Sequence, residues 1–103
     1  MNDIARPAIT LYWRPGCRYC TKLRQGLDRL GLTRVEINIW EDNDGAAVVR
    51  RIANGNETVP TIIIDEIGYV NPSPDLVARL VRDQIERSTS HTQEESGYAP
   101  TTR

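Results

Sequence analysis

The chain has 103 residues, 39% of them hydrophobic, and a formal net charge of −1. This is material for one small domain with a single core, and the near-neutral charge argues against a general nucleic-acid or membrane-surface binder. The two cysteines lie three positions apart, which does not suit a secreted disulfide scaffold. The first seven residues lack the apolar run of a signal peptide and no segment approaches a transmembrane length, so we expect a cytoplasmic protein.

The first half of the chain predicts a strand, a helix, a second strand and a second helix. The first helix has an apolar face at three- and four-residue spacing, formed by Cys20, Leu23, Leu27 and Leu30. Gly31 is suited to end this helix, and the acidic residues within 41–44 are suited to cap the next one. The four expected elements cover residues 8–13, 18–30, 34–39 and 44–54.

The second half predicts a β-hairpin followed by a third helix. Two short apolar runs, at residues 61–64 and 67–70, flank a tight turn. Ser73 can cap a helix that starts at Pro74, where the missing proline N–H would have no helical partner in any case. The buried stripe of this helix is expected to consist of Leu76, Val77, Leu80, Val81 and Ile85.

These elements predict one α/β domain at residues 8–87, between a flexible arm at 1–7 and a disordered polar tail at 88–103. The β-α-β unit should be parallel and right-handed, and the hairpin antiparallel. We therefore expect a mixed four-stranded sheet with helices on both faces. The single histidine, His91, lies in the tail and is expected to be solvated rather than to act as a base or a metal ligand.

The two cysteines form a Cys-x-x-Cys motif at the turn between the first strand and the first helix. Cys17 would lie at the helix N-terminus, where free N–H groups and the helix dipole favour a thiolate, the nucleophile of disulfide chemistry. Cys20, one turn later, should be more buried and less ionised. A structural zinc site needs four ligands and would require a second chain, so redox use is favoured over metal binding.

Basic residues surround this motif. Arg14, Arg18 and Lys22 lie close to Cys17 in sequence, and the last two are four positions apart on one helix face. Two interpretations remain open: a solvated helix face, or a positive rim that stabilises the thiolate or attracts an anionic partner.

Pro60, which directly precedes an apolar strand, is the second candidate site residue. A cis Val59–Pro60 bond would turn the Val59 backbone outward to pair with an extended substrate. From the residues alone, an ordinary trans proline at a strand start is the expected state.

Three segments together resemble the glutaredoxin branch of the thioredoxin superfamily: Tyr-Trp-Arg-Pro-Gly-Cys-Arg-Tyr-Cys (12–20), Thr-Val-Pro (58–60) and Asn-Pro-Ser-Pro-Asp (71–75). The resemblance covers about residues 8–87. It implies a thioredoxin-like β-α-β-α-β-β-α fold and a thiol–disulfide oxidoreductase. It also implies that Cys17 attacks, that Cys20 or a small thiol resolves, and that Pro60 is cis beside Cys17.

Within that family, the chain is similar to mycoredoxins, which act on mycothiol, a sugar-linked cysteine thiol without the carboxylates of glutathione. Asn71-Pro72-Ser73-Pro74 stands where glutathione-using members carry Gly-Gly and Asp residues, and Arg18 replaces a common proline. A groove for the thiol is expected, formed by Arg14, Tyr19, Trp40, Val59, Pro60, Asn71 and Ser73.

The resemblance implies a monomer without a tightly bound cofactor or metal, with mycothiol or glutathione as co-substrate. Its partners would be protein mixed disulfides and the reductase that recycles the small thiol. Three alternatives stay open: a glutathione-dependent glutaredoxin, a general dithiol electron donor and an iron–sulfur cluster carrier. The Trp-Ser-Gly-Phe-type segment of the electron-donor glutaredoxins of ribonucleotide reductase is absent from this chain.

Overall fold

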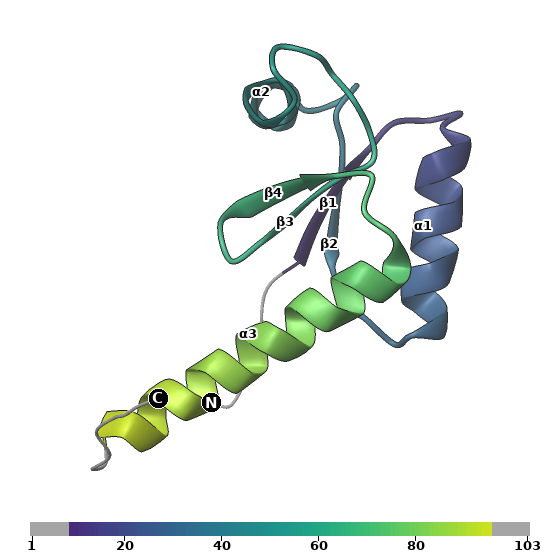
Figure 1. Cartoon of the computed structure of the whole chain (residues 1–103). Coiled ribbons are helices and arrows are strands. Elements are labelled where there is room, and N and C mark those ends of the chain that lie inside the picture. Colours follow the sequence, from purple (N-terminus) through teal and green to yellow (C-terminus); the bar gives the residue numbers. More distant parts are fainter. Residues whose placement is uncertain (1–8, 96–103) are drawn as a thin grey trace.

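The computed structural model describes residues 9–95, so the predicted arm at 1–7 and the last eight residues of the predicted tail lie outside the described part. The predicted element order, β-α-β-α-β-β-α, is confirmed. In chain order, the elements are β1 (Ile9–Trp13), α1 (Arg18–Arg29), β2 (Val35–Asn38), α2 (Asn43–Ile52), β3 (Thr61–Ile64), β4 (Ile67–Val70) and α3 (Pro74–Glu95), as Figure 1 shows.

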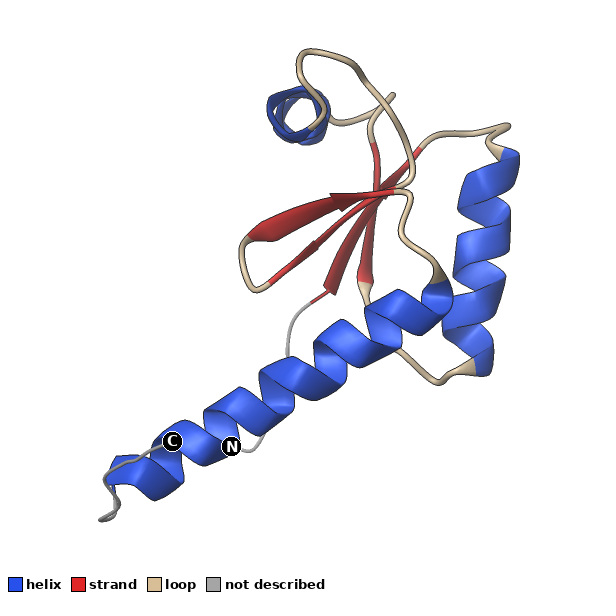
Figure 2. Cartoon of the chain, viewed as in Figure 1, coloured by secondary structure: helices blue, strands red, loops and turns tan. Residues whose placement is uncertain are grey.

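The four strands form one mixed sheet in the order β2-β1-β3-β4. β1 pairs in parallel with β2, and the β1–β3 and β3–β4 pairs are antiparallel. Helices α1 and α3 lie on one face of the sheet and α2 on the other, as seen in the ribbon views of Figures 1 and 2. The expected thioredoxin-like architecture with helices on both faces is therefore confirmed.

Side chains that alternate along β1 build a separate core on each face of the sheet. Leu11 points toward α1 and α3, where the buried cluster also contains Ile9, Leu23, Leu27, Ile62, Ile64 and Val77. Tyr12 points toward α2, where the buried cluster also contains Cys20, Ile39, Ala46, Val49 and Val59. Each large apolar side chain in these clusters contributes roughly 1.5–3 kcal/mol on burial. Cys20 is thus part of the core as well as of the motif.

Helix α1 ends as predicted at Gly31, whose φ of +71° places it in the left-handed region. The Gly31 and Leu32 N–H groups donate to the carbonyls of Asp28 and Leu27, both at 3.0 Å, which closes the helix in a Schellman motif. The prediction that Leu30 belongs to the buried face was wrong, because Leu30 is the capping residue where the chain turns away and it is 45% exposed.

Helix α3 starts as predicted, since the Ser73 hydroxyl accepts a hydrogen bond from the Leu76 N–H at 3.1 Å. It continues to Glu95, so the expectation of a disordered tail was wrong for residues 88–95. Extending a formed helix is far less costly than starting one, and this segment ends in the good helix formers Gln and Glu. Of the predicted stripe, Val77 is fully buried but Ile85 is 38% exposed.

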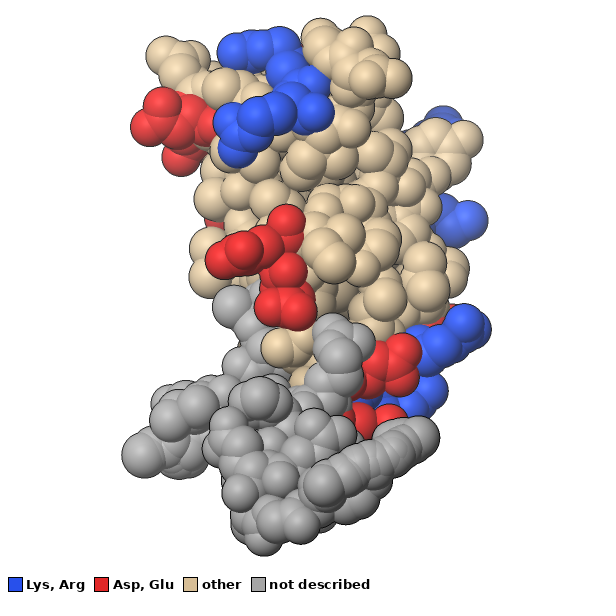
Figure 3. Space-filling model, turned by 60° about the vertical axis from the view of Figure 1, so that its left-hand side comes forward, with Lys and Arg blue, Asp and Glu red and all other residues tan. Residues whose placement is uncertain are grey.

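Figure 3 looks onto the α2 and β3–β4 side of the molecule, where basic side chains lie near the top and along the right edge, and acidic ones at the upper left and toward the middle. The wide area between them is uncharged. On β4, the outer strand of the sheet, Ile67 and Val70 are 54% and 44% exposed. None of the helices within residues 9–95 has the length and apolarity needed to cross a membrane.

Candidate active site

Cys17 lies at the point where the β1–α1 turn becomes helix. Gly16, with φ +80°, makes the turn, and Cys17 is the N-cap residue of α1 with an extended backbone. Its Sγ accepts a hydrogen bond from the Cys20 backbone N–H at 3.2 Å. The sulfur thus takes the place that a capping oxygen usually occupies. A negative charge on this atom would be stabilised by that N–H and by the positive end of the helix dipole.

Cys20 is far more buried than Cys17. Cys20 is 1% exposed, whereas Cys17 is half-buried, and both thiols are free. Burial, followed by the hydrogen bond to the Cys17 side chain, raises the pKa of Cys20 from 9.0 to about 12, against a smaller lowering effect of the Arg14 backbone and charge. At neutral pH Cys20 is therefore a protonated thiol and a donor toward its neighbour, which fits the predicted division of roles.

The Val59–Pro60 segment, which is distant from the cysteines in sequence, lies against Cys17 in the structure. Its peptide bond is cis, so the implication of the family resemblance is confirmed and the expectation of a trans bond, drawn from the residues alone, was wrong. The Val59 carbonyl lies 3.8 Å from the Cys17 Sγ, within reach of the thiol as donor. The Pro60 carbonyl is already used, because it accepts from the Asn71 N–H at 2.7 Å.

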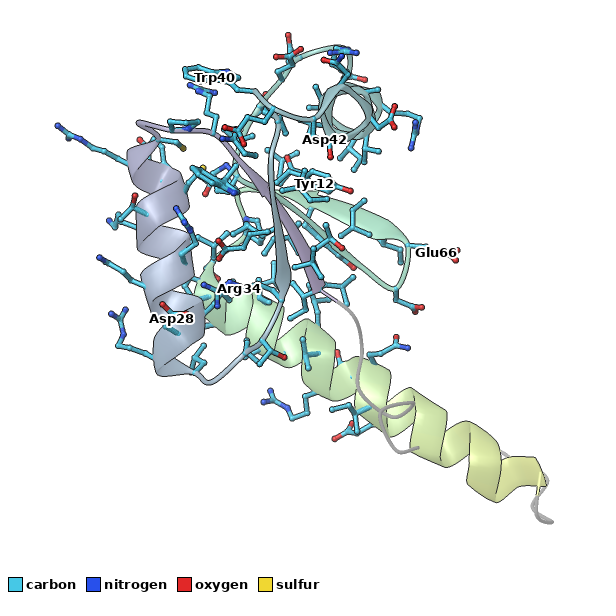
Figure 4. All side chains as sticks on the ribbon, turned by 180° about the vertical axis from the view of Figure 1, so that it is seen from behind. Tyr12, Asp28, Arg34, Trp40, Asp42 and Glu66 are labelled. Carbon is cyan, nitrogen blue, oxygen red and sulfur yellow. The ribbon has the colours of Figure 1, made fainter. Side chains whose placement is uncertain are left out.

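The remaining predicted groove residues differ in exposure and in the contacts that they make. Tyr19 and Trp40 are each 64% exposed, and Figure 4 places Trp40 at the end of the molecule where α1 begins. Arg14 is half-buried beside Cys20, and Asn71 is tied to Pro60. Ser73 is exposed and its hydroxyl caps α3. Binding of a thiol by these residues stays a prediction.

Sequence reasoning missed a set of ion pairs between Arg24, Arg34, Glu36 and Asp28, named here the brace. Trp13 is partly buried, and the Arg24 guanidinium lies 4.5 Å from the centre of its ring. Arg24 also reaches Glu36 on β2 at 3.3 Å. Arg34 joins Glu36 and Asp28, both at 2.9 Å, as Figure 4 shows for Asp28. No pattern of neighbouring residues indicates these contacts, because they join α1 to β1 and β2.

The part of the chain that the structure describes contains no set of side chains suited to hold a metal ion. Residues 9–95 hold no group of three or more His, Cys, Asp or Glu side chains that could hold a metal ion. Surface hollows lined by Asp28, Arg34 and Glu36 lie beside the brace, and one of them extends along α1 to Thr21. What the geometry brings together is one accessible sulfur, one protonated thiol and one backbone carbonyl.

Comparison with known proteins agrees with this geometry. The family model described as Glutaredoxin matches residues 9–67. The chain is 35% identical over 77 residues to a protein named as a glutaredoxin from Mycobacterium tuberculosis strain H37Rv, covering 73% of this chain and 92% of that protein. It is 31% identical over 77 residues to the gene 56 protein of Mycobacterium phage D29, covering 71% of this chain and 81% of that protein.

Two solved structures are similar in fold. The glutaredoxin-like NrdH-redoxin of Escherichia coli, described as having a thioredoxin-like activity profile, superposes with a TM-score of 0.61 at 26% identity. That match covers 71% of this chain and 93% of the other. A glutaredoxin from Archaeoglobus fulgidus gives a TM-score of 0.61 at 20% identity over 74% of this chain and 87% of its own, which bears on the fold alone.

Proposed function

Because the chain belongs to the glutaredoxin family of thiol–disulfide oxidoreductases, we propose that it reduces mixed disulfides between proteins and mycothiol by attack from Cys17. One observation carries the proposal. The Cys17 sulfur is the accessible one of the pair, it accepts the Cys20 N–H at the helix start, and it faces the Val59 carbonyl. Cys20 is buried and holds its proton. Attack by Cys17 is therefore favoured over attack by Cys20.

The proposed reaction exchanges two disulfides in sequence. The Cys17 thiolate attacks the mycothiol sulfur of the mixed disulfide, so a Cys17–mycothiol disulfide forms and the protein sulfur leaves as a thiolate that takes a proton. A second mycothiol, as its thiolate, then attacks the mycothiol sulfur on Cys17. This step releases the Cys17 thiolate and the symmetric mycothiol disulfide, and a reductase returns that disulfide to two thiols.

The choice of mycothiol rests on the segment before α3. Asn71-Pro72-Ser73-Pro74 occupies the place of the Gly-Gly and Asp groups that hold a glutathione carboxylate in other members, and the next residue, Asp75, is acidic. The Gly-Gly stretch that helps to hold a glutathione carboxylate is missing here, and a sugar-linked thiol without that carboxylate would not need it. The organism of the 35% identical relative, a mycobacterium, is consistent with this choice. We place the protein in the cytoplasm as a monomer, where a reduced thiol pool would supply the second step.

A second candidate, a dithiol electron donor, is favoured by one finding. The NrdH-redoxin that superposes at 26% identity is described by its thioredoxin-like activity. In a dithiol route Cys20 would attack the mixed disulfide on Cys17, and this requires Cys20 to lose the proton that its surroundings hold. The Cys20 environment therefore favours the monothiol route near neutral pH.

The decisive experiment compares kcat/KM for the same peptide carrying either mycothiol or glutathione as its mixed disulfide. We expect a preference for the mycothiol form of at least about tenfold, equivalent to about 1.4 kcal/mol. Equal rates, or a preference for glutathione, would contradict the assignment of the thiol. Thioredoxin-like reduction by the purified protein with no dependence on either small thiol would favour the dithiol alternative instead.

A further inference from the structure

We infer that the surface formed by Arg14, Arg18, Tyr19 and Lys22, named here the Cys17 rim, docks an acidic segment of the protein substrate beside its mixed disulfide. The inference rests on the proposed function and adds the chemical class of the protein partner. It concerns the protein half of the mixed disulfide. Arg14 and Tyr19 are shared with the predicted thiol groove, whereas Arg18 and Lys22 lie outside that groove.

The rim adjoins the nucleophile in the chain, because Arg14 lies three residues before Cys17 and Arg18 directly after it. Arg18 is the first residue of α1 and Lys22 follows it by one turn, so both side chains lie on the same side of the helix, and both are exposed. Tyr19, between them in sequence, is 64% exposed. Arg14 precedes the turn and is half-buried. Because α1 begins here, the positive end of its dipole adds to the three cationic side chains.

The rim charges are not neutralised within the described part of the chain. The first turn of α1 carries no acid, and the sequence has none between Asp3 and Asp28. The ion pairs found within residues 9–95 are formed by Arg24, Arg34 and Arg50. These three cations form ion pairs with carboxylates of the same molecule, whereas Arg18 and Lys22 remain available to a partner. An exposed tyrosine among arginines is also typical of the composition of protein interfaces.

Charge complementarity identifies the partner as acidic, and the rest of the molecule fixes where it would lie. The residues that precede and open α2 include Glu41, Asp42 and Asp44, all exposed, and Figure 4 places Asp42 on the α2 side of Trp40. An acidic segment would be repelled from that side and attracted to the rim. Mycothiol, without the carboxylates of glutathione, would leave the rim charge uncompensated. The protein half of the mixed disulfide is therefore the expected source of the counter-charge.

The test uses three peptides of equal length, each carrying mycothiol on one cysteine that is flanked by Glu, Gln or Lys residues. We measure kcat/KM for each peptide at low salt and at about 0.5 M salt, where surface charges are screened within a few ångströms. Two exposed ion pairs predict a preference for the acidic over the neutral peptide of about fivefold at low salt. We expect the preference to approach one at high salt and the basic peptide to react more slowly than the neutral one.

A matched pair of double variants separates docking from net charge. Arg18→Gln with Lys22→Gln removes two rim cations, and Arg29→Gln with Arg82→Gln removes two exposed cations elsewhere. Arg29 is the last residue of α1, about 16 Å along the helix from its start and beyond the screening length of about 10 Å at 0.1 M salt. The acidic-to-neutral ratio should fall to about one in the rim variant and stay about fivefold in the control. Using the ratio cancels any effect of the charges on Cys17 itself.

Three outcomes would overturn the inference: a ratio near one in the unaltered protein at low salt, an equal fall of the ratio in both double variants, or a dimer at low salt that only the rim variant abolishes. The last would make a second copy of the chain the occupant of the rim. If no peptide is turned over, the proposed function fails. The rim remains testable, because fluorescence anisotropy with unreactive Cys→Ser peptides should still show a fivefold tighter Kd for the acidic one.

Discussion

Replacing Gly26 by alanine tests the packing that holds the start of α3 against α1. Gly26 is buried in α1, and a Cβ atom built there would lie 2.3 Å from the Cγ and 2.8 Å from the Cβ of Pro74. Both are atoms of a proline ring, which cannot rotate away as a flexible side chain could. Space for the methyl group can therefore be made only by shifting the start of α3, together with the segment that precedes it.

Two opposing effects set the magnitude of this change. Alanine is favoured over glycine in a helix interior by about 1 kcal/mol, whereas overpacking a close contact costs about 1–3 kcal/mol. Because ordinary carbon–carbon contacts are about 3.5–4.0 Å long, a contact of 2.3 Å belongs at the upper end of that cost. The expected net loss in the free energy of unfolding is about 1–2 kcal/mol, or a fall in Tm of about 5–10 °C.

Urea unfolding of Gly26→Ala, Pro74→Ala and the double variant measures the effect and its cause. The two residues should be coupled by at least about 0.5 kcal/mol, because removing the ring leaves room for the new methyl group. Gln25→Ala is the control, since it introduces the same residue at an exposed position of the same helix and should be neutral or slightly stabilising. A Gly26→Ala protein that is more stable by about 1 kcal/mol, with no coupling to Pro74, would refute the reasoning.

Three further predictions concern the site. Cys17→Ser should abolish reduction of mycothiol mixed disulfides, whereas Cys20→Ser should retain much of it; equal loss in both would indicate the dithiol route. In the folded chain Cys20 keeps its proton up to a pKa of about 12, compared with 9.0 as its ordinary value. The stabilising effect of this proton is complete below pH 9 and is lost as the pH rises toward 12, at up to about 1.4 kcal/mol per pH unit. Urea unfolding at stepped pH should show this slope in the unaltered protein and lack this part of it in Cys20→Ala. Arg24→Gln should lower the free energy of unfolding by about 0.5–1 kcal/mol and red-shift Trp13 fluorescence in a Trp40→Phe background, and an unchanged spectrum would argue against the stacked contact.

Signals that act between neighbours in the chain were readable from the sequence. The helix that begins after Cys17, the stop at Gly31 and the Ser73 cap each depend on residues within a few positions of one another. The apolar runs predicted β3 and β4 with the bounds that the structure gives. The order of strands and helices then followed from the handedness of the first β-α-β unit and from the hairpin.

Other features depend on residues far apart in sequence, and no pattern of neighbouring residues indicates them. Arg24 on α1 covers the ring of Trp13 on β1 and also pairs with Glu36 on β2, so these contacts need three elements to come together. The close approach of Gly26 to Pro74 likewise needs α1 and α3 to pack side by side. The polar composition of residues 88–95 does not exclude a helix that continues from one already formed.

The sequence by itself determined that one sulfur stands at the start of a helix, because the turn, the cap and the helical periodicity are all local. Only the tertiary structure decided what that sulfur faces. The Val59 carbonyl, 42 positions away, reaches Cys17 through a cis bond and the pairing of β1 with β3. Burial in a cluster built from several elements keeps the Cys20 proton in place. Contacts of this kind are set by how the layers pack, since each depends on the positions of several elements at once.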